Sequence, residues 1–339
     1  MQSFKVLVVV NDINKLRLSQ STVGILHRIG ERGHQGYVTS VSDLSWGEGD
    51  VPQVWCQKIP LNDRCEEWLK DLQTTTLEYR ALTDWDLILV RTNPARDKRR
   101  RWAHDVLLDL LIVVEDQGTV ILNSPKMLRM ASSKMYLQSF PVSIRPKTLI
   151  SHRLEEIVPF IERQTHKCIL KPLCGTGGSS VFIVKPEDLS NLHQIVEVIA
   201  QNDFVIVQEY IEEADLGDVR LLLVNGDVLS VDDKVASVAR LRQGYDLRSN
   251  VAVGGKPAPA EYTLEMQRIV ATVKPKLVQD GVFLAGLDVI GRKIVEINVF
   301  SPGGFDDASR FANRDFTAAY LDAAEMKVMA NREKTNLEG

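Results

Sequence analysis

A glycine-rich turn between two apolar runs is the feature that most limits how this chain can fold. The runs, residues 168–170 and 181–184, have the length and composition of β-strands. Lys171 ends the first run, and the turn that follows contains Gly175, Thr176, Gly177 and Gly178. Glycines let backbone N–H groups approach a ligand closely, and consecutive free amides form a concave anion site to which a lysine adds charge. The segment predicts a hairpin that closes over phosphates. A glycine-rich hairpin without a ligand is the alternative, and the residues around the turn do not match a P-loop.

Charge and cysteine content limit the partners. The 339 residues carry a net charge of −4, which argues against nucleic acid as the main partner. The basic run at residues 98–101 is the local exception, and we interpret it as the solvated start of a helix rather than a nucleic-acid patch. Four cysteines without C-x-x-C spacing indicate neither zinc nor a disulfide framework, so we expect a reducing, cytoplasmic setting. Every apolar run is shorter than the ~20 residues of a membrane span, so we expect no membrane partner.

Strands alternate with helices in the N-terminal third. Apolar runs at 5–10, 87–90 and 120–123, together with a short strand at 35–40, alternate with helical segments near 22–32 and 102–117. This alternation predicts an open parallel sheet flanked by helices, with a binding crevice at the carboxyl ends of the strands. Asn11, Asp12 and Arg91 fall at those ends.

The pattern changes after residue 123. We expect helices at 125–140, 187–200 and 263–279, a strand at 204–209, and hairpins over 220–231 and 283–299. Residues 232–259 have no clear period, and a loop of this length is either a functional lid or disordered. The predicted divisions are 1–123, 124–203, 204–325 and a tail at 326–339.

A second group of candidate functional residues lies on the hairpin at 283–299 and consists of Asp288, Glu296 and Asn298. A three-residue loop places Asp288 opposite Glu296, whereas a two-residue loop pairs Asp288 with Val295 and turns Glu296 to the other face. We predict the first register. Two carboxylates and an amide then offer oxygen ligands that suit Mg²⁺. A polar sheet face without a cation is the alternative, although facing acids without a cation are destabilising.

Taken in order, these segments resemble the ATP-grasp superfamily, and most closely its bacterial glutathione synthetase family. The resemblance is carried by residues 123–134, 169–184, 208–220, 239–255 and 286–302. It implies an α/β (α+β ATP-grasp) fold, in which an N-terminal open parallel α/β domain precedes two ATP-grasp subdomains that hold the nucleotide between them.

The resemblance also implies roles for individual residues. Those implied to contact ATP are Lys134, Lys171, Gly175, Thr176, Gly177, Gly178, Gln208, Glu209, Tyr210, Ile211 and Asp218. Asp288, Glu296 and Asn298 are implied to ligate two Mg²⁺ ions, with Mn²⁺ as an alternative. Arg220, Arg240 and Asn250 are implied to stabilise a phosphorylated intermediate. Arg91, Arg248, Ser301 and Pro302 are implied to contact the substrates.

The implied activity is that of an ATP-dependent carboxylate–amine ligase acting through an acyl-phosphate, with γ-glutamylcysteine and glycine as the preferred pair. The alternatives are a related acid–amine pair, a non-catalytic ATP-binding regulatory protein, and kinase-like transfer to a hydroxyl. We expect small-molecule acid and amine partners and a homo-oligomer of two or four copies. The chain departs from the family pattern at Asn93, Cys174, Tyr245 and residues 303–305, mostly on segments that face the substrates.

Overall fold

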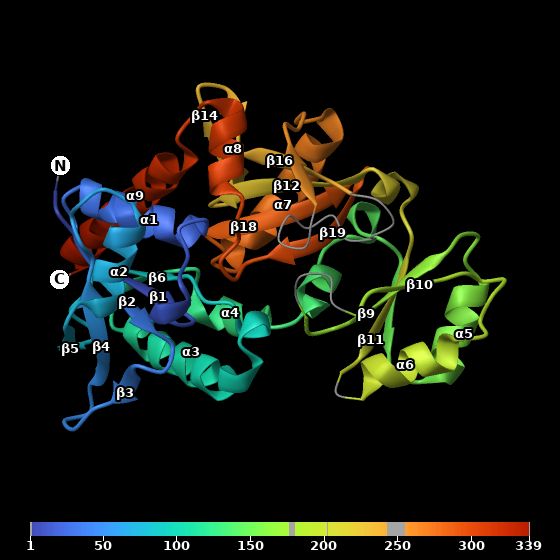
Figure 1. Cartoon of the computed structure of the whole chain (residues 1–339), viewed down its shortest axis with the longest axis horizontal. Helices are drawn as coiled ribbons and strands as arrows, with labels where there is room; N and C mark the ends of the chain where they lie inside the picture. Colours follow the sequence, from blue (N-terminus) through green and yellow to red (C-terminus); the bar gives the residue numbers. More distant parts are fainter. Residues whose placement is uncertain (1, 176–179, 202, 243–254, 339) are drawn as a thin grey trace.

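A computed structural model describes residues 2–175, 180–201, 203–242 and 255–338, whose strands form three main sheets (Figure 1). The first sheet has seven strands in the order β3-β4-β2-β1-β6-β7, with β5 beside β4. Its parallel centre is formed by β1 (Lys5–Val10), β2 (Gln35–Ser40), β6 (Leu87–Val90) and β7 (Val120–Leu122). These are the strands that the apolar runs predicted. The helices α1 (Ser21–Glu31) and α3 (Arg101–Asp116) also lie within a residue or so of their predicted positions.

The sequence did not predict the antiparallel extension of this sheet. It consists of β3 (Leu44–Trp46), β4 (Pro52–Lys58) and β5 (Leu77–Ala81), with α2 (Glu66–Thr74) between β4 and β5. β3 is short, and β4 and β5 expose large side chains, Trp55 at 46% and Tyr79 at 49%. They therefore lack the continuous apolar pattern of the buried parallel strands.

The second sheet is antiparallel, with the order β10-β9-β11-β8. Its strands are β8 (Thr148–Ser151), β9 (Cys168–Pro172), β10 (Phe182–Val184) and β11 (Val205–Glu209). The predicted hairpin is confirmed, because β9 and β10 pair with Leu170 opposite Phe182. The helices α5 (Leu154–Glu162) and α6 (Leu192–Ala200) pack against the buried face and give this sheet a core of its own. Since β11 completes this sheet, the expected division between residues 203 and 204 cuts the strand off from its partners.

The third main sheet has the order β17-β16-β12-β18-β19, with β13 on β12. Its strands are β12 (Gly217–Val224), β13 (Asp227–Val228), β16 (Ser237–Leu241), β17 (Lys256–Ala258), β18 (Leu284–Ile290) and β19 (Lys293–Asn298). A two-stranded sheet of β14 (Ser230–Val231) and β15 (Lys234–Val235) lies beside it in sequence, and α7 (Leu264–Gln279) leads into β18. The expectation of an irregular loop at 232–259 was wrong in its described part, because β15, β16 and β17 form there. β16 pairs with β12, β17 with β16 and β15 with β14, and this pairing supplies the order that the local pattern does not show.

The expected helix at 125–140 is divided into α4 (Pro125–Met130) and the 3₁₀ helix η4 (Lys134–Ser139). The hydroxyl of Ser133 accepts a hydrogen bond from the Met135 N–H and so starts a new turn. The backbone N–H of Lys134 donates to the Leu173 carbonyl at 3.1 Å, which ties this turn to the end of β9.

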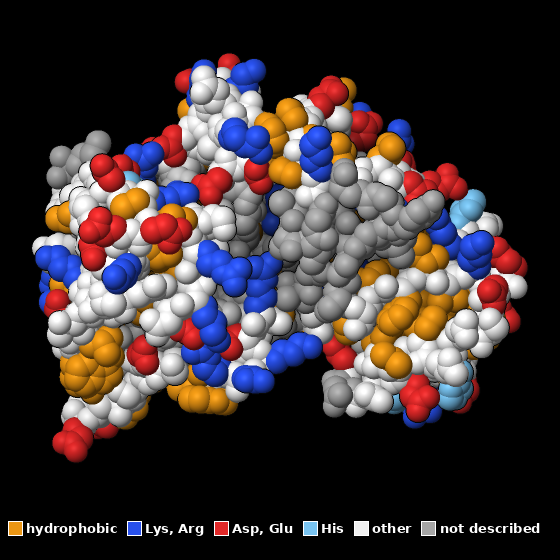
Figure 2. Space-filling view, in the orientation of Figure 1, with side chains coloured by type: hydrophobic (Ala, Val, Ile, Leu, Met, Phe, Trp, Pro, Cys, Tyr) orange, Lys and Arg blue, Asp and Glu red, His pale blue; other side chains and the backbone are white. Residues whose placement is uncertain are grey.

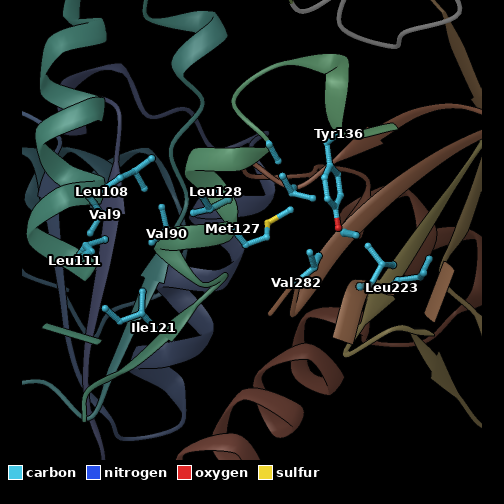
Figure 3. Close-up of a cluster of buried hydrophobic side chains, with 14 of the residues drawn as sticks. Val9, Val90, Leu108, Leu111, Ile121, Met127, Leu128, Tyr136, Leu223 and Val282 are labelled. Carbon is cyan, nitrogen blue, oxygen red and sulfur yellow. The ribbon is translucent and has the colours of Figure 1, made fainter. Parts of the chain in front are cut away.

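One hydrophobic core joins the first and third sheets (Figure 3). Val90 and Ile121 of the first sheet lie at one end, Met127 and Leu128 of α4 in the middle, and Leu223 of β12 at the other. Next to this core, the buried Asn123 side chain donates to the carbonyls of Leu284 and Val299 and accepts from two backbone N–H groups of the third sheet. These two sheets therefore form one packed body.

The C-terminal segment is a helix. α9 (Phe316–Glu338) lies beside α1, and Arg32 of the turn after α1 pairs with Glu325 at 2.5 Å (Figure 1). The expected boundary between 325 and 326 therefore falls inside one helix that packs on the N-terminal part. None of the helices in the described ranges is long and apolar enough to cross a membrane.

Candidate active site

The β18–β19 hairpin places Asp288 opposite Glu296, as predicted, but it does so by a different route. Its loop has two residues, because Ile290 pairs with Lys293, and this loop alone would set Asp288 against Val295. A β-bulge leaves Val295 as an extra residue on β19 and restores the pairing of Asp288 with Glu296. The two carboxylates therefore share one face of the sheet.

Asp288 is buried between two arginines of neighbouring strands. Arg220, opposite it on β12, binds both carboxylate oxygens through Nε and Nη2. Nη2 of Arg240, on β16, lies 2.9 Å from Oδ2 of Asp288, and its Nε donates to Asp218 at 2.9 Å. Burial by itself would raise the pKa of Asp288, but the two guanidinium groups hold it well below the usual range. Asn298 completes the group, since its amide donates to Oδ2 of Asp288 at 3.2 Å.

Lys171 faces this group from the second sheet. Its ammonium donates to the Gln208 side chain at 3.1 Å, across the pair of strands β9 and β11. Burial lowers the pKa of Lys171 to about 8, and the nearby carboxylates of Glu296 and Asp288 oppose this shift. The open face of the second sheet therefore lies within electrostatic reach of the β18–β19 hairpin.

The side chain of Lys134, the first residue of η4, contacts the start of the glycine turn. Its ammonium donates to the carbonyl of Gly175 at 2.7 Å. The expected residues Thr176, Gly177 and Gly178 lie outside the described residues, as do Arg248 and Asn250 of the expected lid and the departure at Tyr245.

The segment after β11 connects the second and third sheets. Glu209 ends the strand and accepts a bond from the Lys147 N–H at 2.9 Å, and Ile211 precedes a 3₁₀ turn. Tyr210 is buried, and its hydroxyl donates a hydrogen bond to Asp215. Burial first, and then this carboxylate, raise the pKa of Tyr210 to about 12.

The sequence did not indicate the pocket of about 350 Å³ beside this segment. It is lined by Thr165, His166, Lys167, Lys185, Glu187, Tyr210, Glu212 and Asp215.

Arg91 lies at the carboxyl end of β6 and is only 5% exposed. It donates to the Thr22 hydroxyl at 3.3 Å and to the carbonyl of Pro302 at 3.0 Å, while Ser301 lies 3.5 Å from that hydroxyl. The third nitrogen, Nη1, is buried with no hydrogen-bond partner among the described residues. Burial lowers the pKa of Arg91 to about 10, and Tyr320 of α9 opposes the shift. The expected substrate residues Arg91, Ser301 and Pro302 are thus brought together, and Thr22 belongs to the region 12–22 that the resemblance implied beside Arg91. The sequence did not point to Tyr320.

Among the described residues, no group of three or more His, Cys, Asp and Glu side chains is arranged to hold a metal ion. The predicted trio is consistent with this absence, because it contains two carboxylates and one amide, Asn298, in place of a third such side chain. All three are hard oxygen donors of the kind that Mg²⁺ prefers when substrate phosphates supply further ligands. The donor chemistry therefore fits the expected cation.

Two family models match the chain. The prokaryotic glutathione synthetase N-terminal domain matches residues 4–129, and the ATP-grasp domain of the same enzyme matches residues 133–313. The glutathione synthetase of Synechococcus elongatus is 34% identical over 89% of this chain and 93% of its own length. That of Brucella melitensis is 31% identical over 96% of this chain and 99% of its own length.

Solved structures agree on the fold. D-cycloserine synthetase is 16% identical, with a TM-score of 0.64 over 95% of this chain and 99% of that chain. The ATP-grasp ligase PsnB, complexed with a minimal precursor, is 17% identical, with a TM-score of 0.61 over 97% of this chain and 100% of that chain. The expected ATP-grasp fold is thereby confirmed. The chain belongs to the prokaryotic glutathione synthetase family and is an ATP-dependent ligase that forms C–N bonds.

Proposed function

We propose that this chain joins γ-glutamylcysteine to glycine with the hydrolysis of ATP to ADP and phosphate. The observation that carries the proposal is that Lys171, on the open face of the second sheet, lies near enough to Glu296 and Asp288 of the β18–β19 hairpin for their charges to act on its ammonium. A nucleotide bound between them would have a cation on one side of its phosphates and carboxylates on the other.

We assign the nucleotide to the space between the second and third sheets. We assign the positive charge beside the phosphates to Lys171 and Lys134. The resemblance assigns Thr176, Gly177 and Gly178, which lie outside the described residues, to the same phosphates. The backbone of residues 208–211 holds the adenine, and Asp218 is assigned to the ribose. Asp288, Glu296 and Asn298 would hold two Mg²⁺ ions, or Mn²⁺, which would neutralise charge on the phosphates.

We assign the acid to the buried guanidinium of Arg91. A buried cation without an anionic partner is costly, and the free Nη1 offers a donor to a substrate carboxylate. Thr22 and the Pro302 carbonyl hold the guanidinium in place, and Ser301 lies next to them.

The reaction then has two steps. A carboxylate oxygen of the acid attacks the γ-phosphorus of ATP, ADP leaves, and an acyl-phosphate forms. The nitrogen of the amine attacks the acyl carbon, phosphate leaves, and the amine loses a proton to solvent as the C–N bond forms. We assign charge stabilisation of the acyl-phosphate to Arg220 and Arg240, with Asn250 from the lid. Positioning and charge supply most of the catalysis in such a scheme.

Release of ADP tests the assignment. γ-Glutamylcysteine, glycine and Mg-ATP together should give ADP, phosphate and a tripeptide of the expected mass. Omission of either the acid or glycine should stop product formation. Turnover with a different acid or amine only would contradict the substrate pair while leaving the ligase class intact. A phosphorylated hydroxyl as product would favour the kinase-like alternative, and tight ATP binding without turnover on any pair would favour a regulatory role.

Arg91→Met should raise KM for the acid at least about 30-fold, because truncating one partner of a buried charge pair costs ~2–5 kcal/mol of binding. KM for ATP should stay within about twofold, since Arg91 lies on the first sheet, away from the nucleotide contacts. The exposed Arg163→Met is the matched control and should change neither constant. An equal rise in both KM values would contradict the placement of the acid.

We also propose a cytoplasmic location, which the four unpaired thiols support. The homo-oligomer of two or four copies stays a prediction.

A further inference from the structure

β5 is the outermost strand of the first sheet and has one open side. It pairs with β4, with Tyr79 opposite Trp55, and with no other strand in the described part of the chain. The backbone N–H of Trp55 donates to the carbonyl of Asp43, which lies between β2 and β3 on the opposite side of β4. Trp55 and Tyr79 are therefore a pair without hydrogen bonds to each other, and the N–H and C=O groups of Tyr79 point to the open side of β5. We call this open side the β5 edge, and in Figure 1 it lies at the outer margin of the molecule.

The sheet face that carries Tyr79 is aromatic and exposed. The rings of Trp55 and Tyr79 have centroids 4.7 Å apart, and each side chain is about half exposed. Leu77, two residues before Tyr79 on the same face, is 47% exposed. In Figure 2, hydrophobic side chains gather at the lower left, where Figure 1 places β4 and β5. Exposed aromatic side chains beside an unpaired strand edge are features of surfaces that bind another chain.

The opposite face of β5 carries one acid and one base. Glu78 and Arg80 lie on either side of Tyr79 in sequence, and Nε and Nη2 of Arg80 donate to Oε2 of Glu78 at 2.9 and 2.5 Å. Nη2 also donates to the Tyr37 hydroxyl at 3.1 Å. No described residue forms a hydrogen bond with the remaining atoms, Nη1 of Arg80 and Oε1 of Glu78. Both side chains are therefore held in place within the chain, and each keeps an atom for a further ion pair.

The order of these charges is self-complementary. When a second β5 pairs antiparallel with the β5 edge about a twofold axis at Tyr79, the two Tyr79 residues exchange their hydrogen bonds. Glu78 of each copy then lies opposite Arg80 of the other, at the positions where facing side chains are closest. Opposite charges across a strand pair are stabilising, and like charges are destabilising. A slip by two residues would set Glu78 against Glu78 or Arg80 against Arg80, so the charges select one register.

The same charges select the partner. Charged side chains on an edge strand normally discourage the addition of another strand. A strand that lacks this order of charges leaves Glu78 and Arg80 without partners across the edge, whereas an identical strand satisfies both.

We propose that two copies of this chain associate through their β5 edges, so that the two first sheets become one continuous sheet across a twofold axis. The contact covers Tyr79 and its aromatic neighbour Trp55, and the two Glu78–Arg80 pairs set its register. The association is closed, because each copy uses its β5 edge once. The β5 edge lies outside the candidate active site, so this inference does not depend on the function proposed above.

Sedimentation velocity of the full chain tests this with two charge reversals, E78R and R80E. E78R leaves only cations at the four facing positions and R80E only anions, so each variant alone should dissociate at least about tenfold more readily than the unchanged chain. Over a dilution series each variant should therefore reach half the mass of the unchanged chain. An equal mixture of the two variants should regain the full mass, because the cations of one copy then face the anions of the other.

The matched controls are E162R and R163E, at exposed positions at the end of α5 on the second sheet. They change the net charge from −4 to −2 and from −4 to −6, as E78R and R80E do. Both controls should keep the mass of the unchanged chain, and ADP release should be the same in all four variants. Melting temperatures show that each variant is folded, and recovery in the mixture uses the same two variant chains, so it cannot come from a change in their folding.

Four outcomes would overturn the proposal. An unchanged chain that is monomeric at every concentration would leave the β5 edge to a strand of another protein. Full mass in both E78R and R80E would place the contact between copies elsewhere. Half mass in each variant without recovery in the mixture would show that Glu78 and Arg80 do not face each other across the contact. A mass that grows without limit with concentration would indicate open association in place of a closed pair.

Discussion

Lys171→Met should lower kcat/KM for ATP by about 100- to 1000-fold, the usual cost of removing one charge that stabilises a transferring phosphoryl group. The side chain lies on the open face of the second sheet, within reach of Glu296 and Asp288, where the phosphates are placed. Methionine has a similar length and no charge, so the strand pairing should persist. ADP release measures the loss, and Lys70→Met, at an exposed position of α2, should leave turnover unchanged.

The same substitution should not lower stability. Burial lowers the pKa of Lys171 from 10.5 to about 8, so the folded state releases this proton before the unfolded state does. Below pH 8 the buried charge therefore opposes folding, and the free energy of unfolding contributed by this group rises with pH between about 8 and 10.5. At pH 7 the variant should be more stable by about 1–3 kcal/mol, and this gain should vanish above pH 10.5. Urea unfolding of both proteins at pH 7 and pH 9.5 checks the sign. A variant that is less stable at pH 7 would contradict the burial of a charged Lys171.

Asp288→Asn should abolish turnover and also destabilise the fold by about 3–5 kcal/mol, because it leaves the guanidinium groups of Arg220 and Arg240 without their shared carboxylate. Glu296→Gln is the informative comparison. Glu296 is less buried, and we expect it to lose turnover while the free energy of unfolding changes by only about 1 kcal/mol. Urea unfolding and ADP release separate the two effects.

A double variant tests whether the lost ion pair is the cause of the lower stability of Asp288→Asn. Adding Arg220→Met to Asp288→Asn removes the cation that the first substitution leaves unpaired, because Arg240 keeps its pair with Asp218. The double variant should therefore recover part of the lost stability without any recovery of turnover. Equal stability of Asp288→Asn and Glu296→Gln would show that the ion pairs of Asp288 do not support the fold.

The sequence predicted the parts of the fold whose local pattern and final environment agree. β1 and β6 are buried on both faces, so continuous apolar runs mark them, and the bounds of both strands match the predicted ones. β15, β16 and β17 are different, because they are short and gain their order by pairing with β14, β12 and β16, respectively. α9 was likewise missed, since its apolar residues have no clear helical stripe and its place is set by contacts with the turn after α1.

In the candidate site, the sequence predicted which residues take part better than it predicted which neighbouring groups hold their side chains in place. Asp288 lies opposite Glu296 as the hairpin pattern predicted, and the charges of both carboxylates act on Lys171 of the second sheet. The shared use of Asp288 by two arginines could not be predicted, because it depends on the lateral order of β16, β12 and β18. The pairing of Asp218 with Arg240 has the same origin, and the resemblance had suggested only a contact between Asp218 and ribose.

Val295 is the one surplus residue of the β18–β19 ribbon, so the ribbon tolerates its loss better than its incorporation into the ladder. Without Val295, Asp288 stays opposite Glu296, because Val289 already pairs with Ile294 on the other side of the bulge. If the ladder absorbed Val295 instead, Asp288 would face Val295, and Glu296 and Asn298 would turn to the opposite side of the sheet. A catalytic carboxylate here can therefore be lost with no change to its own codon, through a shift of the bulge next to it.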